Sequence, residues 1–222
     1  MRHVGVALLI SSEDLKQIQQ ELTSFDEVRE KVLEASRIAT RLSDWSIIQM
    51  HRNEMERAAH SLKEAEKSLS RIKALLKRKP ELKQSGSVIV AYQEYVEAML
   101  FYGLLRNRRI ASLKDVGVEP VPYILGVLDL IGELRRLALN HLRKGKTSDA
   151  EKTLRTMEEL YENVLALDHT AIVPTFRVKA DSARRIIEST RGDVITEVRR
   201  VSLERAIKSL HNEVKKKKAT SA

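Results

Sequence analysis

Along most of the chain, apolar residues recur every three or four positions, the interval at which side chains return to one face of an α-helix. An amphipathic helix is expected over about 27–51. Its buried stripe is predicted to comprise Val28, Val32, Ala35, Ala39, Leu42 and Trp45. A short helix is expected to precede it and to begin at Ser11, because Asp14 three residues later completes a capping box.

Further amphipathic helices are expected on both sides of the centre of the chain. One is predicted to end before the Lys79-Pro80 break, and its apolar face comprises Ala58, Leu62, Ala65, Leu69, Ile72 and Leu75. Downstream, Ser148 with Glu151 is expected to cap another helix. Two more are expected over about 176–190 and from 194 into the basic run Lys215–Lys218.

Two helices near the middle of the chain, expected over about 88–106 and from 120 to near Gly145, have a different composition. Each is apolar on nearly all sides, and each apolar stretch is interrupted by just two charged residues, both acidic. The acid pairs are Glu94 with Glu97 and Asp129 with Glu133. Since a helix that is apolar all round is buried, these two are predicted to be central helices.

The composition favours one all-α domain over 1–222. Apolar residues make up 42% of the chain, and four prolines and eight glycines leave few places where helices must break. A loose start is expected over 1–10. A basic, disordered tail is expected over 215–222.

The charge balance favours a polyanionic partner. Forty Lys and Arg against thirty-one Asp and Glu give a net charge of +9, which suits nucleic acid but leaves anionic lipid open. No uninterrupted apolar run reaches the about eighteen residues of a membrane span, so no membrane partner is expected and the protein is expected to be cytoplasmic. The absence of cysteine excludes disulfides, thiolate zinc sites and a cysteine nucleophile.

The two acid pairs suggest a metal site. Residues three or four positions apart share one helix face, so each pair presents two carboxylates together. Buried carboxylates need positive charge, and an all-oxygen ligand set suits Mg²⁺ or Mn²⁺. Such ions orient phosphodiesters and activate water. The alternative is that the pairs face solvent or meet Lys and Arg, as most acidic pairs do.

At these acids the chain resembles a known family. The segment GSVIVAYQEYVEAMLFYGLL, residues 86–105, and the segment VEPVPYILGVLDLIGELRRLALN, residues 118–140, are similar to the QEYVEA and DLxGE motif regions of the translin family. The likeness is closest to its translin-associated factor X branch. It extends upstream to residues 35–52 and downstream to Arg191-Gly192.

The resemblance implies a seven-helix fold, a hollow octamer, binding of single-stranded RNA or DNA, and Mg²⁺-dependent endoribonuclease activity. It implies that Glu94, Glu97 and Asp129 are the catalytic, metal-binding acids. Glu133 is expected as a further metal ligand, although non-catalytic translin resembles this chain there too. Because the chain carries the catalytic motifs itself, a homo-octamer is expected.

Basic residues near the motifs are candidate RNA contacts. They are Arg37, His51, Arg52, Arg135 and Arg136. Each has an ordinary alternative, as a solvated residue, a helix C-terminal cap or a salt-bridge partner. The tyrosines of residues 86–105 and Trp45 are expected to pack rather than to stack on bases.

The leading hypothesis is therefore cleavage of single-stranded or short RNA by metal-activated water. A second hypothesis is a non-catalytic ring that binds RNA or single-stranded DNA. A third is an all-α nucleotide pyrophosphohydrolase, although the second motif here is DxxxE where ExxD is expected.

Overall fold

The computed structural model describes residues 10–220, without the side chains of residues 214 and 216–220. This described part contains seven α-helices, two short 3₁₀ helices and no strand, which confirms the all-α, seven-helix prediction. The chain divides into two compact units, Met1–Tyr102 and Gly103–Ala222. The prediction of a single domain stays a prediction.

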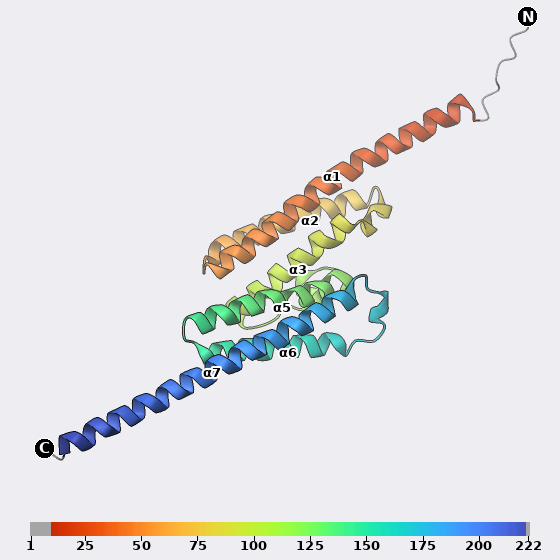
Figure 1. The fold of residues 1–222 in the computed structure, drawn as a ribbon. Coiled ribbons are helices and arrows are strands. Elements are labelled where there is room, and N and C mark those ends of the chain that lie inside the picture. The colour runs from red at the N-terminus through yellow and green to blue at the C-terminus, as the bar shows by residue number, and fades with distance from the viewer. Residues whose placement is uncertain (1–9, 221–222) are drawn as a thin grey trace, which may run out of the picture. The chain divides into compact units, whose positions relative to one another are not determined.

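The first unit is built on a helical hairpin. Helix α1 (Ser12–His51) and helix α2 (Met55–Leu76) lie side by side and run in opposite directions (Figure 1). A 3₁₀ helix, η1 (Pro80–Gln84), follows, and then most of helix α3 (Gly86–Asn107). Inside the hairpin the hydroxyl of Ser61 donates to the side-chain oxygen of Gln49 at 2.8 Å, so a buried polar pair joins the two helices.

Helix α1 is longer than predicted. The hydroxyl of Ser11 accepts a hydrogen bond from the backbone N–H of Asp14 at 3.0 Å, so the predicted cap is confirmed. The predicted short helix and the helix over 27–51 are, however, one continuous helix of 40 residues. Nothing in the sequence between them breaks a helix, since the segment 15–27 contains neither proline nor glycine.

The buried stripe of α1 departs from the prediction towards the C-terminus. Val28, Val32, Ala35 and Ala39 are buried as expected, but Leu42 is half-buried and Trp45 is 46% exposed. Ser43 and Ser46 occupy the buried face instead. Their hydroxyls donate to the carbonyls of Ala39 and Ser43 in the same helix, at 3.0 and 2.7 Å, so they are buried without unpaired donors.

The apolar face of α2 is confirmed. Ala58, Leu62, Ala65, Leu69 and Ile72 are buried, and Leu75 at the helix end is half-buried. The helix ends at Leu76, ahead of the predicted break.

The second unit is a three-helix bundle preceded by a short helix, α4 (Leu113–Val116). The bundle consists of α5 (Pro120–Arg143), α6 (Thr147–Leu165) and α7 (Phe176–Thr220), with η2 (Thr170–Ile172) between the last two. Each helix of the bundle packs against both others. The core is centred on α5, where Leu130, Ile131 and Leu134 are fully buried.

Helix α6 begins earlier than predicted. It starts at Thr147, with Lys146 at the N-cap position and no side-chain cap, so the predicted cap at Ser148 is wrong. Gly145 adopts a left-handed conformation, with φ at 69°, and the N–H of Lys146 donates to the carbonyl of His141. This tight turn leads the chain directly from α5 into α6.

Helix α7 is one helix of 45 residues, whereas two helices were predicted with a break near Arg191-Gly192. Contacts with the neighbouring helices hold it straight through this point. Arg135 of α5 donates to the hydroxyl of Thr190 at 2.8 Å and pairs with Asp193 at 3.1 Å, while Arg191 pairs with Glu158 of α6 at 2.7 Å.

The predicted disordered tail over 215–222 is wrong up to Thr220, because α7 continues to that residue. Residues 221–222 lie outside the described part. The predicted loose start over 1–10 also lies outside it, apart from residue 10.

Helix α3 is apolar and long enough to cross a membrane by length and composition, and among residues 10–220 it is the one helix that meets this test. Half of the apolar stretch is buried in the structure. Buried core helices of soluble proteins have the same composition, which agrees with the prediction that α3 is a central helix.

The core of the second unit depends on α5. Replacing the fully buried Leu134 by alanine is expected to lower the free energy of unfolding by about 2–5 kcal/mol, because it leaves a cavity among packed helices. Leu139→Ala on the same helix is the matched control, since this leucine is 37% exposed and its loss should cost much less. Urea titration followed by circular dichroism measures both, and equal losses would contradict this description of the core.

Candidate metal centre

The two acidic residues of α3, Glu94 and Glu97, lie in the middle turns of the helix. Glu97 is 7% exposed and Glu94 is half-buried, and the neighbouring Gln93 and Tyr95 are also buried. Both residues take part in interactions within the structure. Of this pair, Glu97 is buried as expected, while the apolar stretch of α3 as a whole is half buried. A glutamate as deeply buried as Glu97 is rare unless it is compensated by partners or by a cation.

The tyrosines of α3 pack, as predicted. Burial is the larger cause, and the nearby Glu66 carboxylate the smaller one, that together raise the pKa of Tyr95 to about 12. The phenol therefore stays neutral at physiological pH. The hydroxyl of Tyr92 reaches the carbonyl of Leu69 on α2 at 3.5 Å, so this side chain contributes to packing inside the first unit.

Helix α5 holds the second acid pair. Asp129 and Glu133 are one turn apart, and their side chains are 21% and 23% exposed. A carboxylate oxygen of Asp129 accepts a hydrogen bond from the ammonium group of Lys179 at 2.5 Å. Glu133 lies 3.8 Å from the guanidinium group of Arg136. The second unit thus supplies positive charge to both acids from its own side chains.

Lys179 was not predicted. It belongs to the first turns of α7, fifty positions after Asp129, and nothing in its local sequence distinguishes it from other lysines. Only the packing of α7 against α5 brings it to the aspartate. With 27% of its side chain exposed, Lys179 is more buried than most lysines. Its ion pair with Asp129 compensates for this burial.

The basic residues proposed as RNA contacts on α5 have different surroundings. Arg135 is engaged within the second unit by Thr190 and Asp193 of α7. Its guanidinium group therefore has a structural role, joining α5 to α7. Arg136 is exposed and pairs loosely with Glu133, so it can still reach a ligand. Their binding of nucleic acid stays a prediction.

The candidates on α1 also differ from one another. Arg37 is exposed. His51 ends the helix and packs its ring against that of the buried Phe101 of α3, with ring centres 4.9 Å apart. Arg52 follows the helix, and its guanidinium group lies 5.8 Å from the ring centre of Trp45. His51 is thus mainly a packing residue, whereas the two arginines are accessible.

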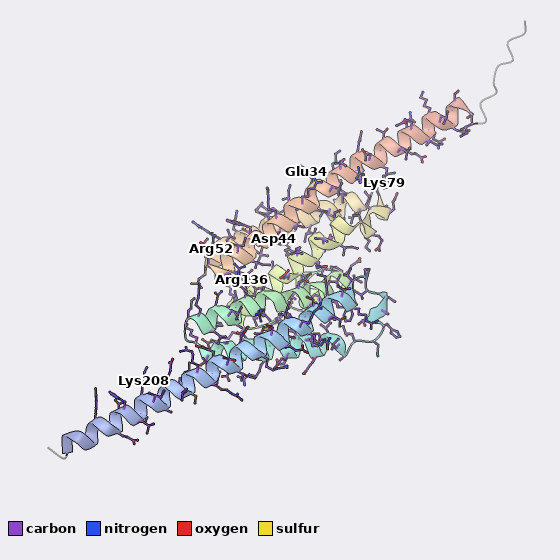
Figure 2. All side chains as sticks on the ribbon, in the orientation of Figure 1. Glu34, Asp44, Arg52, Lys79, Arg136 and Lys208 are labelled. Carbon is purple, nitrogen blue, oxygen red and sulfur yellow. The ribbon has the colours of Figure 1, made fainter. Side chains whose placement is uncertain are left out.

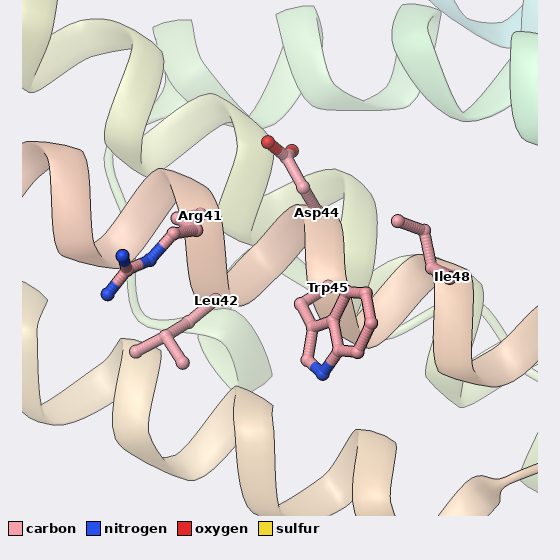
Figure 3. A pocket seen from close by; sticks show the side chains of 5 residues that line it. All are labelled: Arg41, Leu42, Asp44, Trp45 and Ile48. Atoms are coloured by element: carbon pink, nitrogen blue, oxygen red, sulfur yellow. The ribbon is translucent and has the colours of Figure 1, made fainter.

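Trp45 corrects another prediction, because it does not pack in the core. It lines a shallow hollow on the surface of α1 together with Arg41, Leu42, Asp44 and Ile48 (Figure 3). Arg52 is labelled in Figure 2. Its guanidinium group gives the Trp45 indole a cation–π neighbour on an accessible surface.

The donor atoms of the two acid pairs fit a hard divalent cation. All four are carboxylates, they are partly or largely buried, and the pair on α5 already binds cationic side chains. Neither pair has a histidine one turn away, so zinc and di-iron chemistry is not favoured.

Comparison with known proteins shows which family this chain is similar to. The model of the Translin family matches residues 27–216. An uncharacterized protein of Methanocaldococcus jannaschii is 30% identical and covers 90% of both chains. The translin-associated protein X homolog of Schizosaccharomyces pombe is 26% identical over 64% of this chain and 67% of its own length. Translin-associated protein X of Rattus norvegicus is 25% identical over 70% of this chain and 67% of its own.

Solved structures agree with the sequence comparisons. AfC3PO in complex with duplex RNA has a TM-score of 0.75 and 31% identity, covering 83% of this chain and 96% of that one. Apo-NeC3PO has a TM-score of 0.74 and 25% identity, covering 87% of this chain and all of that one. Because the family model spans most of the chain and the fold agrees along its length, this chain belongs to the Translin family.

Proposed function

We propose that this chain is a metal-dependent endoribonuclease. The observation that carries the proposal is the placement of two partly buried acid pairs on apolar helices, in a chain of the Translin family. The similarity to translin-associated protein X of several organisms and to AfC3PO, solved with duplex RNA, supports RNA as the ligand. The net charge of +9 also suits a polyanion.

We propose further that Glu94, Glu97 and Asp129 together hold Mg²⁺ or Mn²⁺. These three acids are the ones that the family resemblance implies as metal ligands, and carboxylate oxygens are the ligands that such ions prefer. Glu133, one turn from Asp129, is proposed as an additional ligand. When bound, a divalent cation would orient the scissile phosphate and lower the pKa of the attacking water.

The protein's own side chains have separate roles in this proposal. The burial of Glu97 limits the positions open to its carboxylate, which favours a fixed ligand. A carboxylate that does not bind the cation is available to accept the proton of the attacking water. Lys179 pairs with Asp129, and its ammonium group would be available to contact a phosphate oxygen if a cation bound Asp129 in its place.

RNA is proposed to be held by the accessible arginines Arg37, Arg52 and Arg136, with weaker roles for Arg135 and His51, which are engaged in packing. Single-stranded RNA is the substrate that the family resemblance suggests. The duplex bound by AfC3PO makes double-stranded RNA a second substrate to test. Assembly into a homo-octamer and a cytoplasmic location are part of the same proposal. The family match gives no support to the pyrophosphohydrolase alternative.

The ligand assignment is tested by Glu97→Gln. This change keeps the shape of the side chain but removes its charge, so Mg²⁺-dependent cleavage of labelled RNA is expected to fall at least about a hundredfold while RNA binding is retained. Asp129→Asn should have the same effect, and Glu133→Gln a smaller one. Cleavage is followed by gel electrophoresis of single-stranded and duplex substrates with and without Mg²⁺.

Glu159→Gln on α6 is the matched control, because this glutamate is exposed and lies outside the proposed site. Full activity of Glu97→Gln would refute the site. If the wild type binds RNA but cleaves neither substrate with Mg²⁺ or Mn²⁺, the non-catalytic binding ring becomes the better hypothesis.

The ion pair of Lys179 with Asp129 is tested by a double-mutant cycle in EDTA, with Lys179→Met and Asp129→Asn made singly and together. Since both side chains are mostly buried, a coupling energy of about 1–2 kcal/mol is expected, above that of exposed pairs. Thermal or urea denaturation measures it. Lys152 with Asp149 is the control pair, because both side chains are largely exposed and 3.9 Å apart, and no coupling is expected.

A second measurement tests whether Lys179 competes with a metal ion for Asp129. Lys179→Met removes the cation that competes for Asp129, so calorimetry should show Mn²⁺ binding several-fold more tightly than in the wild type. Weaker Mn²⁺ binding in this variant would show that the lysine does not compete with the metal.

A further inference from the structure

The C-terminal part of α1 presents arginines and a tryptophan on one exposed side. Residues 37, 41, 45, 48 and 52 follow one another at steps of three and four, so they lie on the same helix face. Arg37, Arg41, Trp45 and Arg52 are exposed, and Ile48 is half-buried. These five residues are called the arginine-tryptophan face.

This face is positively charged. Among the side chains that the structure describes, none forms an ion pair with Arg37 or Arg41, so both guanidinium groups are available to an anion. Asp44 is the acid nearest the indole in sequence, but its side chain points in the opposite direction from the indole (Figure 3). Glu34, the preceding acid on this side of α1, already pairs with Arg71 of α2 at 3.2 Å.

Trp45 lies between the arginines and is 46% exposed. Leu42 and Ile48 line the shallow hollow beside it, so the ring is part of a small apolar surface (Figure 3). The guanidinium group of Arg52 lies 5.8 Å from the ring centre. A flat aromatic surface with cations around it matches a nucleotide, because a base is flat and aromatic and its phosphate is an anion.

The spacing of the face also suits one nucleic-acid strand. Arg37 and Arg41 are four residues apart, which is about 6 Å along the helix axis, and Trp45 lies about 6 Å further on. Neighbouring phosphates of an extended single strand are separated by a similar distance. A strand that follows α1 can thus place successive phosphates on the arginines while one of its bases reaches the indole.

Other occupants match this face less well. The bases of a duplex are already stacked and paired, so they offer no free ring face to an indole. The headgroup of an anionic lipid has no ring to stack. A second copy of this chain has the same excess of positive charge, +9, which opposes contact with a face rich in arginine.

We propose that Trp45 stacks on an unpaired base of single-stranded RNA. The three arginines of the same face hold the phosphates on either side of that base. The stacking makes this face selective for single-stranded over duplex RNA, because only an unpaired strand can present a base to the ring. The inference rests on RNA as the ligand of the proposed function, but not on the metal site or on cleavage.

Fluorescence tests the stacking directly, because Trp45 is the one tryptophan of the chain. The full chain is titrated in EDTA with an unstructured single-stranded RNA and with a duplex of the same sequence. The single strand is expected to quench a large part of the tryptophan emission, since a stacked base quenches an indole. The duplex is expected to bind with little quenching. Before RNA is added, the emission should have the long wavelength of a water-exposed indole.

Affinities measured by anisotropy of labelled RNA, also in EDTA, test the selectivity. Trp45→Leu keeps an apolar side chain without a ring, so single-stranded RNA should bind about tenfold more weakly and duplex RNA almost unchanged. Trp45→Tyr keeps a ring and should restore most of the affinity. Arg41→Gln is the matched control, because the loss of a phosphate contact should weaken both RNAs alike and reduce the salt dependence of binding.

Several results would overturn the proposal. If Trp45→Leu binds single-stranded RNA as well as the wild type does, Trp45 has no stacking role, while RNA binding itself stands. Emission typical of a buried indole in the RNA-free protein, with a lower molar mass of Trp45→Leu by light scattering, would show that a second copy covers the face. Quenching by anionic phospholipid vesicles but not by RNA would identify a lipid ligand. If the wild type binds neither RNA, this proposal and the proposed function fail together.

Discussion

The cost of placing carboxylates on buried helices is the constraint on which the candidate site depends. An ionised carboxylate removed from water needs hydrogen bonds or nearby cations, and without them it takes up a proton. Glu97 is buried on α3, and Asp129 is partly buried on α5. The second unit meets this demand with Lys179, whose ammonium group contacts Asp129. A divalent cation would meet it more completely, which is the physical basis of the proposed metal site.

Helix α7 links several features of the second unit. Near its start it carries Lys179 to Asp129, and around Thr190 it is held by Arg135 of α5 and by the pairing of Arg191 with Glu158. The same helix then continues beyond the bundle to Thr220. These contacts keep the helix continuous past Gly192, so Lys179 belongs to one long helix that is held at more than one point.

The elements that could be predicted are those specified by local pattern. The apolar face of α2, the cap at Ser11, and the apolar character of α3 and α5 all follow from residue spacing, and the structure confirms them. The errors have a common cause. Ser43 and Ser46 replace Leu42 and Trp45 on the buried face because small residues with internally bonded hydroxyls fit where helices lie close, and hydrophobicity alone cannot show this.

The sequence by itself determined the helical class and the residue types of the site, because periodicity and charge-free stretches are properties of consecutive residues. It also nominated Glu94, Glu97, Asp129 and Glu133. Only tertiary structure decided that α7 is one helix, that Lys179 contacts Asp129, and that Arg135 serves packing. These outcomes depend on pairs of side chains that are 33, 50 and 55 positions apart. Such contacts form only when the helices pack.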